Sequence, residues 1–330
     1  MEPVTDETLA RARDAYLRFA EHEAEQISPL YADWARGIVG DEALLDLIAG
    51  LPRRKRQPNL VFAAARMSGV QLGAWSDVRG AFSAAWPAIR AQALVRSTQT
   101  NEPLRMATLL PALAGIRGDI SLVEIGASAG LCLYPDRWRY RFGPGRYAGD
   151  ANRPLLETDA SASVPVPARL PRVAWRGGID LNPLSPSDAD TKDWLEALIW
   201  PNAEGRVDEE RVDRLRTGIA IARREPAHII AGDLRERTRD LILEARGHAD
   251  KVVVWHSAVL AYLDMTDRVE FSRLMAELDV TWVSNEGALV TPGRPAPWAT
   301  AADFVLRVDG EPLAVTHPHG RSITWHTDIV

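Results

Sequence analysis

Apolar residues recur every three to four positions through the first third of the chain, the spacing of helices that each bury one face. The first such segment follows Thr5, a candidate N-cap, and places Leu9, Ala12 and Tyr16 on one side. Further helices are predicted at 29–39 (capped by Ser28), 41–49, 60–67, 77–95 with a break near Pro87, and 103–113. We therefore expect residues 1–116 to form an all-α N-terminal domain, a helical cap.

From Gly118 onward, short runs of β-branched and aromatic residues alternate with helical patterns. Strands separated by helices imply a mostly parallel sheet with helices on both faces. The pattern predicts an α/β, Rossmann-like domain over residues 117–330, with an inserted hairpin around 143–145 and a C-terminal antiparallel hairpin turning at 309–310. Strands are predicted at 121–125, 172–179, 228–231, 251–255, 280–284, 304–308 and 313–316, helices at 193–199, 209–223, 235–245 and 267–278, and an edge strand at 322–326.

The composition narrows the possible partners. A formal net charge of −6 argues against nucleic acid, which is bound through clustered positive charge. The longest nearly uncharged apolar stretch, Val252–Leu263, is shorter than the ~20 residues of a membrane span. The acidic N-terminus lacks an export signal, and the one cysteine, Cys132, excludes an internal disulfide framework. We expect a cytoplasmic protein that acts on a small molecule and binds neither nucleic acid nor membrane.

A glycine-rich turn follows the first predicted strand. Glu124 closes the strand, and Gly126 and Gly130 enclose Ala127, Ser128 and a second alanine. Glycine permits a tight turn, and we expect a helix directly behind it whose N-terminal N–H groups receive a carboxylate or phosphate. The dinucleotide fingerprint needs glycines at positions where this chain has serine and leucine, which weakens a nicotinamide-dependent oxidoreductase. The turn resembles motif I of S-adenosylmethionine-dependent methyltransferases, although such a turn also occurs without a ligand.

Polar residues close the next three strands as well. Asp180 ends the second strand, where an acid can bind ribose hydroxyls, and Asp233 ends the third, beside the expected adenine. His256 ends the fourth and is the candidate general base, because imidazole ordinarily titrates near neutral pH. Ligands bind at the carboxyl ends of such strands. The predicted cofactor-binding residues are Glu124, Gly126, Ala127, Ser128, Gly130, Asp180, Leu181, Asp233, Leu234 and Trp255, although a place in the core is the simpler interpretation of Trp255.

Eight short motifs together resemble a bacterial family of uncharacterised proteins, domain of unknown function 2332. The resemblance covers nearly the whole chain and implies the fold more firmly than an activity. It leads us to expect asparagine where Cys132 stands. The motifs are SPLY (28–31), TNEPLR (100–105), EIGASAG (124–130), GIDLNP (178–183), WP (200–201), GD (232–233), WHSAVLAYL (255–263) and WVSNEG (282–287).

Two further polar groups have alternative interpretations. Asn101, Glu102 and Arg105 either cap the helix that Pro103 opens or reach over the strand ends and hold substrate, where the Arg105 fork suits a carboxylate or phosphate. Residues 285–286, Asn-Glu, are either a loop cap or a substrate acceptor. The histidines at positions 317, 319 and 326 match no metal-ligand spacing, so no metal is predicted.

These observations favour a methyltransferase that uses S-adenosylmethionine. Glu124 and the glycine turn would receive the methionine end, Asp180 the ribose, and Asp233 with Leu234 the adenine. The alternative is a non-catalytic module on the same fold that binds a nucleoside-like metabolite or a protein. A side chain that fills the space beside Gly126 would favour the alternative.

Overall fold

The computed structural model describes residues 5–326, which divide into two compact units. The helical unit comprises the chain up to Thr100 together with Asp188–Asp213. The sheet unit comprises Asn101–Ser187 and Arg214–Val330, so the chain passes between the units three times. Within the described range, no helix is long and apolar enough to cross a bilayer.

The helical unit is built from amphipathic helices whose ends follow the predicted signals. Thr5 accepts a hydrogen bond from the Thr8 amide, and Asp41 accepts one from the Leu44 amide. Ser28 precedes its helix as predicted but makes no capping hydrogen bond, and its hydroxyl is buried without a partner. The elements are α1 (Asp6–Arg18), a π-helical turn (Phe19–Ala24), α2 (Pro29–Val39), α3 (Glu42–Ala49), a 3-10 turn (Arg53–Lys55), α4 (Pro58–Met67), α5 (Trp75–Ala84), α6 (Trp86–Val95) and α8 (Ala189–Ala197).

An aromatic cluster forms the core of the helical unit. The Phe62 ring lies 4.9 Å from the Tyr31 ring and 5.4 Å from the Trp34 ring. Trp200, from the later segment of the chain, packs on Phe19 at 5.1 Å and on Tyr31 at 6.0 Å. The Trp-Pro motif therefore anchors residues 188–213 to helices that precede them by more than 100 positions.

The sheet unit contains one largely parallel sheet of 11 strands. The strands are β1 (Asp119–Ile125), β2 (Arg139–Phe142), β3 (Tyr147–Ala148), β4 (Leu155–Ala160), β5 (Arg172–Asp180), β6 (His228–Ala231), β7 (Lys251–Ser257), β8 (Thr281–Gly287), β9 (Phe304–Val308), β10 (Glu311–Thr316) and β11 (Ser322–Trp325). Their order across the sheet is β3-β2-β4-β11-β10-β9-β8-β7-β1-β5-β6. The block from β6 to β8 is parallel, and β9 and β10 follow as antiparallel strands, which confirms the α/β class, the parallel sheet and the C-terminal hairpin.

Two predicted elements differ from the structure. Strand β11 is not an edge strand, because it lies between β10 and β4, and the inserted hairpin β2–β3 extends the sheet beyond it. The helix expected after Gly130 is also absent. Only 3-10 turns occur there, at Leu131–Leu133 and Pro135–Arg137. Pro135 stands beyond the first turn of the expected helix, where it lacks the N–H that the helix interior requires.

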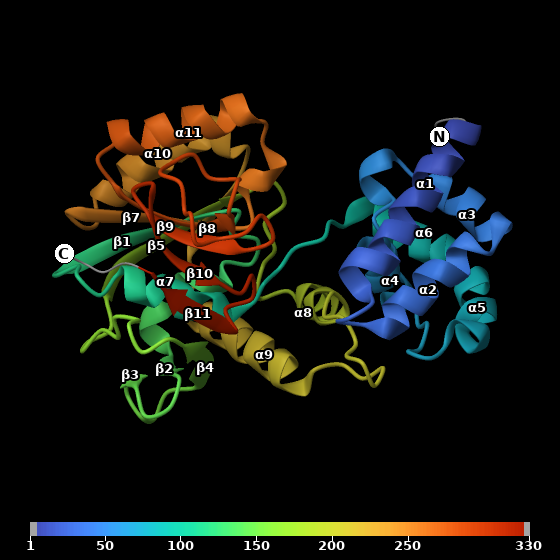
Figure 1. The fold of residues 1–330 in the computed structure, drawn as a ribbon, viewed down its shortest axis with the longest axis horizontal. Coiled ribbons are helices and arrows are strands. Elements are labelled where there is room, and N and C mark those ends of the chain that lie inside the picture. The colour runs from blue at the N-terminus through green and yellow to red at the C-terminus, as the bar shows by residue number, and fades with distance from the viewer. Residues whose placement is uncertain (1–4, 327–330) are drawn as a thin grey trace. The chain divides into compact units, whose positions relative to one another are not determined.

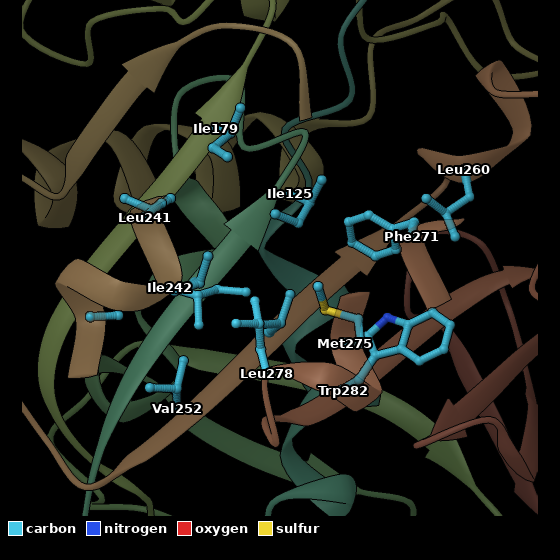
Figure 2. Close-up of a cluster of buried hydrophobic side chains, with 13 residues drawn as sticks. Ile125, Ile179, Leu241, Ile242, Val252, Leu260, Phe271, Met275, Leu278 and Trp282 are labelled. Carbon is cyan, nitrogen blue, oxygen red and sulfur yellow. The ribbon is translucent and has the colours of Figure 1, made fainter. Parts of the chain in front are cut away.

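Helices cover both faces of the parallel block (Figure 1). On one face, α10 (Leu234–Arg246) and α11 (Met265–Glu277) bury a cluster that includes Val123 and Ile125 of β1 (Figure 2). On the other face lies α7 (Met106–Ala112), where Thr108 contacts Asn285 of β8 at 3.5 Å. Because side chains alternate along a strand, Glu124 points away from α10 and toward the face covered by α7.

Candidate functional site

The acids predicted at the strand ends lie on neighbouring strands at one edge of the sheet. Glu124 of β1 is in register with Gly178 of β5, and Asp180 is in register with Ala231 of β6, two residues before Asp233. Strand β1 lies between β5 and β7, so the chain order reverses at β1. In open α/β sheets, ligands bind in the crevice at such a reversal.

The glycine turn uses its own amides within the protein. Gly126, Ser128 and Gly130 have φ angles of 71°, 49° and 68°, the left-handed region that favours glycine. The amides of residues 126 and 127 donate to the Ile179 carbonyl, that of 128 to Asp180, that of 129 to Asn101 and that of 130 to the residue 127 carbonyl. The predicted anion cradle, with free amides and a helix behind them, is therefore not formed by this turn.

Asp180 connects the second strand to the glycine turn. Its Oδ2 accepts a hydrogen bond from the Ser128 amide at 2.8 Å, and its Oδ1 accepts one from the Asn182 amide at 2.7 Å. The carboxylate remains partly exposed, and the next side chain, Leu181, is 75% exposed. The ribose-binding role of Asp180 stays a prediction.

Aliphatic side chains occupy the space beside the glycines. An ideal Cβ on Gly126 would lie 2.5 Å from Val259 Cγ2, and one on Gly130 would lie 2.9 Å from Ile229 Cδ1. Both distances are too short for an alanine without rearrangement. Glycine at these positions is thus required by packing as well as by φ.

A buried polar cluster lies on the α7 side of β1 and β7. Glu124 is only 8% exposed, and its Oε2 has no hydrogen-bond partner. Burial raises the pKa of Glu124 well above its ordinary value, the positive charge of Arg105 lowers it, and the charge of Asp180 raises it further. The hydroxyl of Ser257, at the end of β7, is also buried without a partner. These two oxygens lie at the carboxyl ends of the neighbouring strands β1 and β7. Buried polar groups in a native core are usually hydrogen-bonded, so we take this cluster as the candidate site.

The segment 101–105 closes this cluster from one side. Asn101 donates to Ser128 Oγ at 2.8 Å, so the segment is fastened to the glycine turn. Arg105 donates to the carbonyls of Ser257 at 3.2 Å and Pro318 at 3.0 Å. The structure thus brings Asn101 and Arg105 to the strand ends. The interpretation in which this segment holds substrate needs this position, and the substrate contact itself stays a prediction.

Glu102 has the simpler of its two predicted roles. Its Oε1 accepts a hydrogen bond from the Leu104 amide at 3.2 Å, which caps the short 3-10 turn Pro103–Arg105. The same oxygen pairs with Arg214 of α9 (Glu209–Arg224) at 3.1 Å. Burial raises the pKa of the neighbouring Cys132 well above its ordinary value, so this thiol is held protonated.

His256 lies on the opposite face of the sheet, fully buried against Trp282 and Glu286. The Trp282 indole donates to His256 Nε2 at 2.9 Å, so the imidazole is neutral there and its Nδ1–H donates to Glu286 Oε1 at 2.7 Å. That oxygen also accepts hydrogen bonds from the amides of Val259 at 2.8 Å and Leu260 at 3.1 Å. Both imidazole nitrogens therefore have hydrogen-bond partners. Of the two interpretations of Glu286, the contacts with the loop amides correspond to the loop cap.

The other candidates lie further along the same edge or within the core. Asp233 caps α10 by accepting from the Arg235 amide, and the Arg235 side chain lowers the pKa of this carboxylate. Leu234 packs against the core cluster, and Trp255 is fully buried. Their predicted contacts with a cofactor stay predictions.

Three residues of the site had weaker signals in the sequence. Ser257 stands beside His256, but a serine at a strand end is common and carries no pattern of its own. Val259 is an aliphatic residue in an apolar run, and Arg214 is one of several charges on an amphipathic helix. Only the fold reveals that Val259 meets Gly126 and that Arg214 meets Glu102.

Over residues 5–326, no group of three or more His, Cys, Asp or Glu side chains is arranged to hold a metal ion. His317 accepts a hydrogen bond from the His319 amide, and His326 stacks on Trp298. A shallow pocket of about 280 Å³, lined by 143–144, 159–161 and 322–324, contains none of the predicted site residues.

Comparison with known proteins yields one family. The model described as "Uncharacterized protein conserved in bacteria (DUF2332)" matches residues 13–325. No curated protein matches the chain, and no solved structure does.

Proposed function

Because this chain belongs to the family of uncharacterised bacterial proteins DUF2332, whose description names no reaction, we propose its function from the site alone. The proposal is a methyltransferase with a Rossmann-like core that uses S-adenosylmethionine to modify a small molecule. The strand order supports it, since β6-β5-β1-β7-β8 corresponds to the order 3-2-1-4-5 of nucleotide-binding sheets.

The observation that carries the proposal is the unsatisfied Oε2 of Glu124. A buried carboxylate oxygen without a donor is costly, and an ammonium group of a ligand would supply that donor. Arg105 lies close enough for its charge to affect Glu124, and its guanidinium suits a carboxylate. An acid and a guanidinium close enough to influence each other's charge fit the two charges of an α-amino acid, which is the methionine end of the cofactor.

The remaining parts of the cofactor have weaker support. The amides of the glycine turn are engaged, so we assign the ligand's carboxylate to Arg105 and not to the turn. Asp180, partly exposed at the end of β5, is the residue we assign to the ribose hydroxyls, and the exposed Leu181 offers an apolar surface to the adenine. Asp233 would lie beyond the adenine.

Methyl transfer depends mainly on how the donor and the acceptor are positioned. When bound, the cofactor supplies a methyl group on a sulfonium, whose carbon an acceptor lone pair attacks in line with the carbon–sulfur bond while the sulfur leaves with the electrons of that bond. The chain orients the donor through Glu124 and Arg105 and keeps the strand end dry, and such alignment accounts for a large part of the rate. Both nitrogens of His256 are hydrogen-bonded, so we no longer assign it the role of general base. We assign that role to no other side chain, and the acceptor's proton passes to water.

Calorimetry with S-adenosylhomocysteine tests the proposal, because this product carries the same amino-acid end. We expect saturable binding to the wild type and a loss of at least about tenfold in affinity for Glu124→Gln, as a charged hydrogen bond contributes about 1.5–3 kcal/mol. Glu277→Gln, on the exposed surface of α11, is the matched control and should bind normally. Absence of binding at millimolar ligand, or an unchanged Glu124→Gln, would contradict the proposal.

One observation favours the second candidate, a non-catalytic module on the same fold. Val259 fills the space beside Gly126, the feature expected if the glycine turn serves only packing. If the wild type fails to bind S-adenosylhomocysteine, the non-catalytic module becomes the better account of the fold.

A further inference from the structure

The His-Pro-His sequence near the C-terminus, which matches no metal site, forms the tight turn between β10 and β11. Proline is favoured at the second position of such a turn and glycine at the fourth, and His317–Gly320 has both. The Gly320 amide donates to the His317 carbonyl at 2.8 Å, and the His319 amide donates to His317 Nδ1 at 3.0 Å. The turn 317–320 is therefore fixed in shape by its own hydrogen bonds.

This turn packs directly on the segment that carries Arg105. An ideal Cβ on Gly320 would lie 2.2 Å from the Leu104 carbonyl oxygen and 2.9 Å from the Arg105 amide nitrogen. Only glycine, which lacks a Cβ, allows two backbones to approach this closely. The buried Thr158 of β4 also donates to the Gly320 carbonyl at 2.7 Å, which keeps the turn in its place.

Two backbone carbonyls orient the guanidinium of Arg105. Its Nε donates to the Pro318 carbonyl of the turn at 3.0 Å, and its Nη1 donates to the Ser257 carbonyl at the end of β7 at 3.2 Å. Among residues 5–326, Nη2 has no hydrogen-bond partner and no carboxylate lies within ion-pair distance of the guanidinium, although Arg105 is only 8% exposed. A buried charge is ordinarily paired, so a guanidinium held in this way is suited to bind an anion.

We propose that the turn 317–320 is the positioning element of Arg105, which it orients so that Nη2 meets an anionic group of the ligand. That this group is the α-carboxylate of the cofactor rests on the proposed function, whereas the contacts between the turn and Arg105 belong to the fold. Pro318 and Gly320 act through Arg105 and are positioning residues. Their displacement should weaken recognition of the carboxylate and leave recognition of the nucleoside unchanged.

A pair of ligands separates this role from a general effect on the fold. Calorimetry on the full chain compares S-adenosylhomocysteine with its decarboxylated analogue, which keeps the ammonium group and lacks the carboxylate. We expect Gly320→Ala to weaken binding of S-adenosylhomocysteine by at least about tenfold and binding of the analogue by less than about twofold. Gly118→Ala is the matched control, because Gly118 has a φ of 85° and an added Cβ there meets nothing within 4 Å. It should leave both affinities unchanged.

A second measurement needs no cofactor. The Nε–H resonance of Arg105, assigned by its disappearance in Arg105→Lys, reports the hydrogen bond to Pro318. We expect its hydrogen exchange to be at least about tenfold faster in Gly320→Ala than in the wild type or in Gly118→Ala. Thr158→Val removes the hydroxyl that holds the turn and keeps the shape of the side chain. It should change both measurements in the same direction, and it replaces Gly320→Ala if that variant does not fold.

The outcomes distinguish this inference from the proposed function. If the wild type does not bind S-adenosylhomocysteine, the proposed function fails, and the exchange of the Arg105 Nε–H still decides whether the turn positions Arg105. Unchanged exchange in the turn variants overturns the inference, and so does an equal loss of affinity for the two ligands. Faster exchange together with a loss confined to the ligand that has the carboxylate supports it.

Discussion

At the scale of single residues, Glu124 governs the electrostatics of the candidate site. Its carboxyl is buried beside Asp180, and the nearby Arg105 does not offset the desolvation, so its pKa in the folded protein lies well above 4.5. The folded state therefore binds this proton more tightly than the unfolded chain does. The resulting stabilisation is complete below the ordinary carboxyl pKa and is lost as the pH rises through the raised pKa.

Glu124→Gln removes this titration and retains the shape. We expect the free energy of unfolding of the wild type to fall relative to the variant as the pH rises above 4.5, by at most about 1.4 kcal/mol per pH unit. Urea unfolding at several pH values measures the difference. The surface substitution Glu270→Gln on α11 serves as control, and a pH-independent difference for Glu124→Gln would show that the carboxyl titrates normally.

The glycine turn allows a second test with a matched backbone. Gly126 and Gly145 have φ angles of 71° and 72°, but an ideal Cβ on Gly126 meets Val259 whereas one on Gly145 meets nothing within 4 Å. Alanine at 145 should cost about 1–2 kcal/mol for the left-handed conformation, and alanine at 126 about 1–3 kcal/mol more for overpacking. In a Val259→Ala background the excess should shrink. Equal losses at the two positions would disprove the packing role of Gly126.

At the scale of elements, β-branched runs made the strands of the parallel block predictable. The runs at 228–231 and 304–308 agree with β6 and β9 over their full length. The helix predicted after Gly130 is not formed, because Pro135 lacks the N–H that the interior of a helix requires, and the segment forms two 3-10 turns instead. Strand β11 was misplaced at the edge because its parallel pairing with β4 joins residues more than 160 positions apart, which no local pattern encodes.

The strand-end acids were predictable for a similar reason, since Glu124 and Asp180 lie within the last two residues of their strands and Asp233 stands two residues after its strand. What could not be predicted is how the protein uses these groups itself. Asp180 fastens the glycine turn, and Glu286 fastens the loop after β7 from a neighbouring strand. Such contacts depend on register between strands, so they become visible only in three dimensions.

Glu286 provides the prediction at this scale. Alanine at this position leaves the amides of Val259 and Leu260 and the Nδ1–H of His256 without their acceptor, at a cost of about 3–6 kcal/mol. Glutamine keeps an acceptor oxygen and should cost clearly less. Urea unfolding gives the energies, and hydrogen exchange of the two amides should accelerate in the alanine variant before global unfolding. Exchange limited by global unfolding in every variant would argue against a local anchor.

At the scale of the whole molecule, the two units are interleaved along the chain. Residues 101–116, expected within a helical domain that ends at 116, have their contacts in the sheet unit, and residues 188–213 have theirs in the helical unit. The sequence shows a change of pattern near residue 118, but membership in a unit depends on long-range contacts. Trp200, for example, belongs with Phe19 and Tyr31. Whether the predicted boundary separates independently folding domains is a question for truncation.

Two fragments distinguish the predicted boundary at residue 116 from the division of the chain into the helical and sheet units. Fragment 117–330 lacks Arg105 and the buried residues Met106, Leu109 and Leu110 of α7, each of which contributes about 1.5–3 kcal/mol by burial, and it retains Trp200 without its aromatic partners. Fragment 101–330, with 188–213 replaced by a glycine–serine linker, restores α7 and removes that exposed tryptophan. We expect the second fragment to unfold cooperatively in urea as a monodisperse species and the first to aggregate or unfold without a transition. If fragment 117–330 were equally stable, α7 would be dispensable for the sheet, and the boundary at 116 would stand.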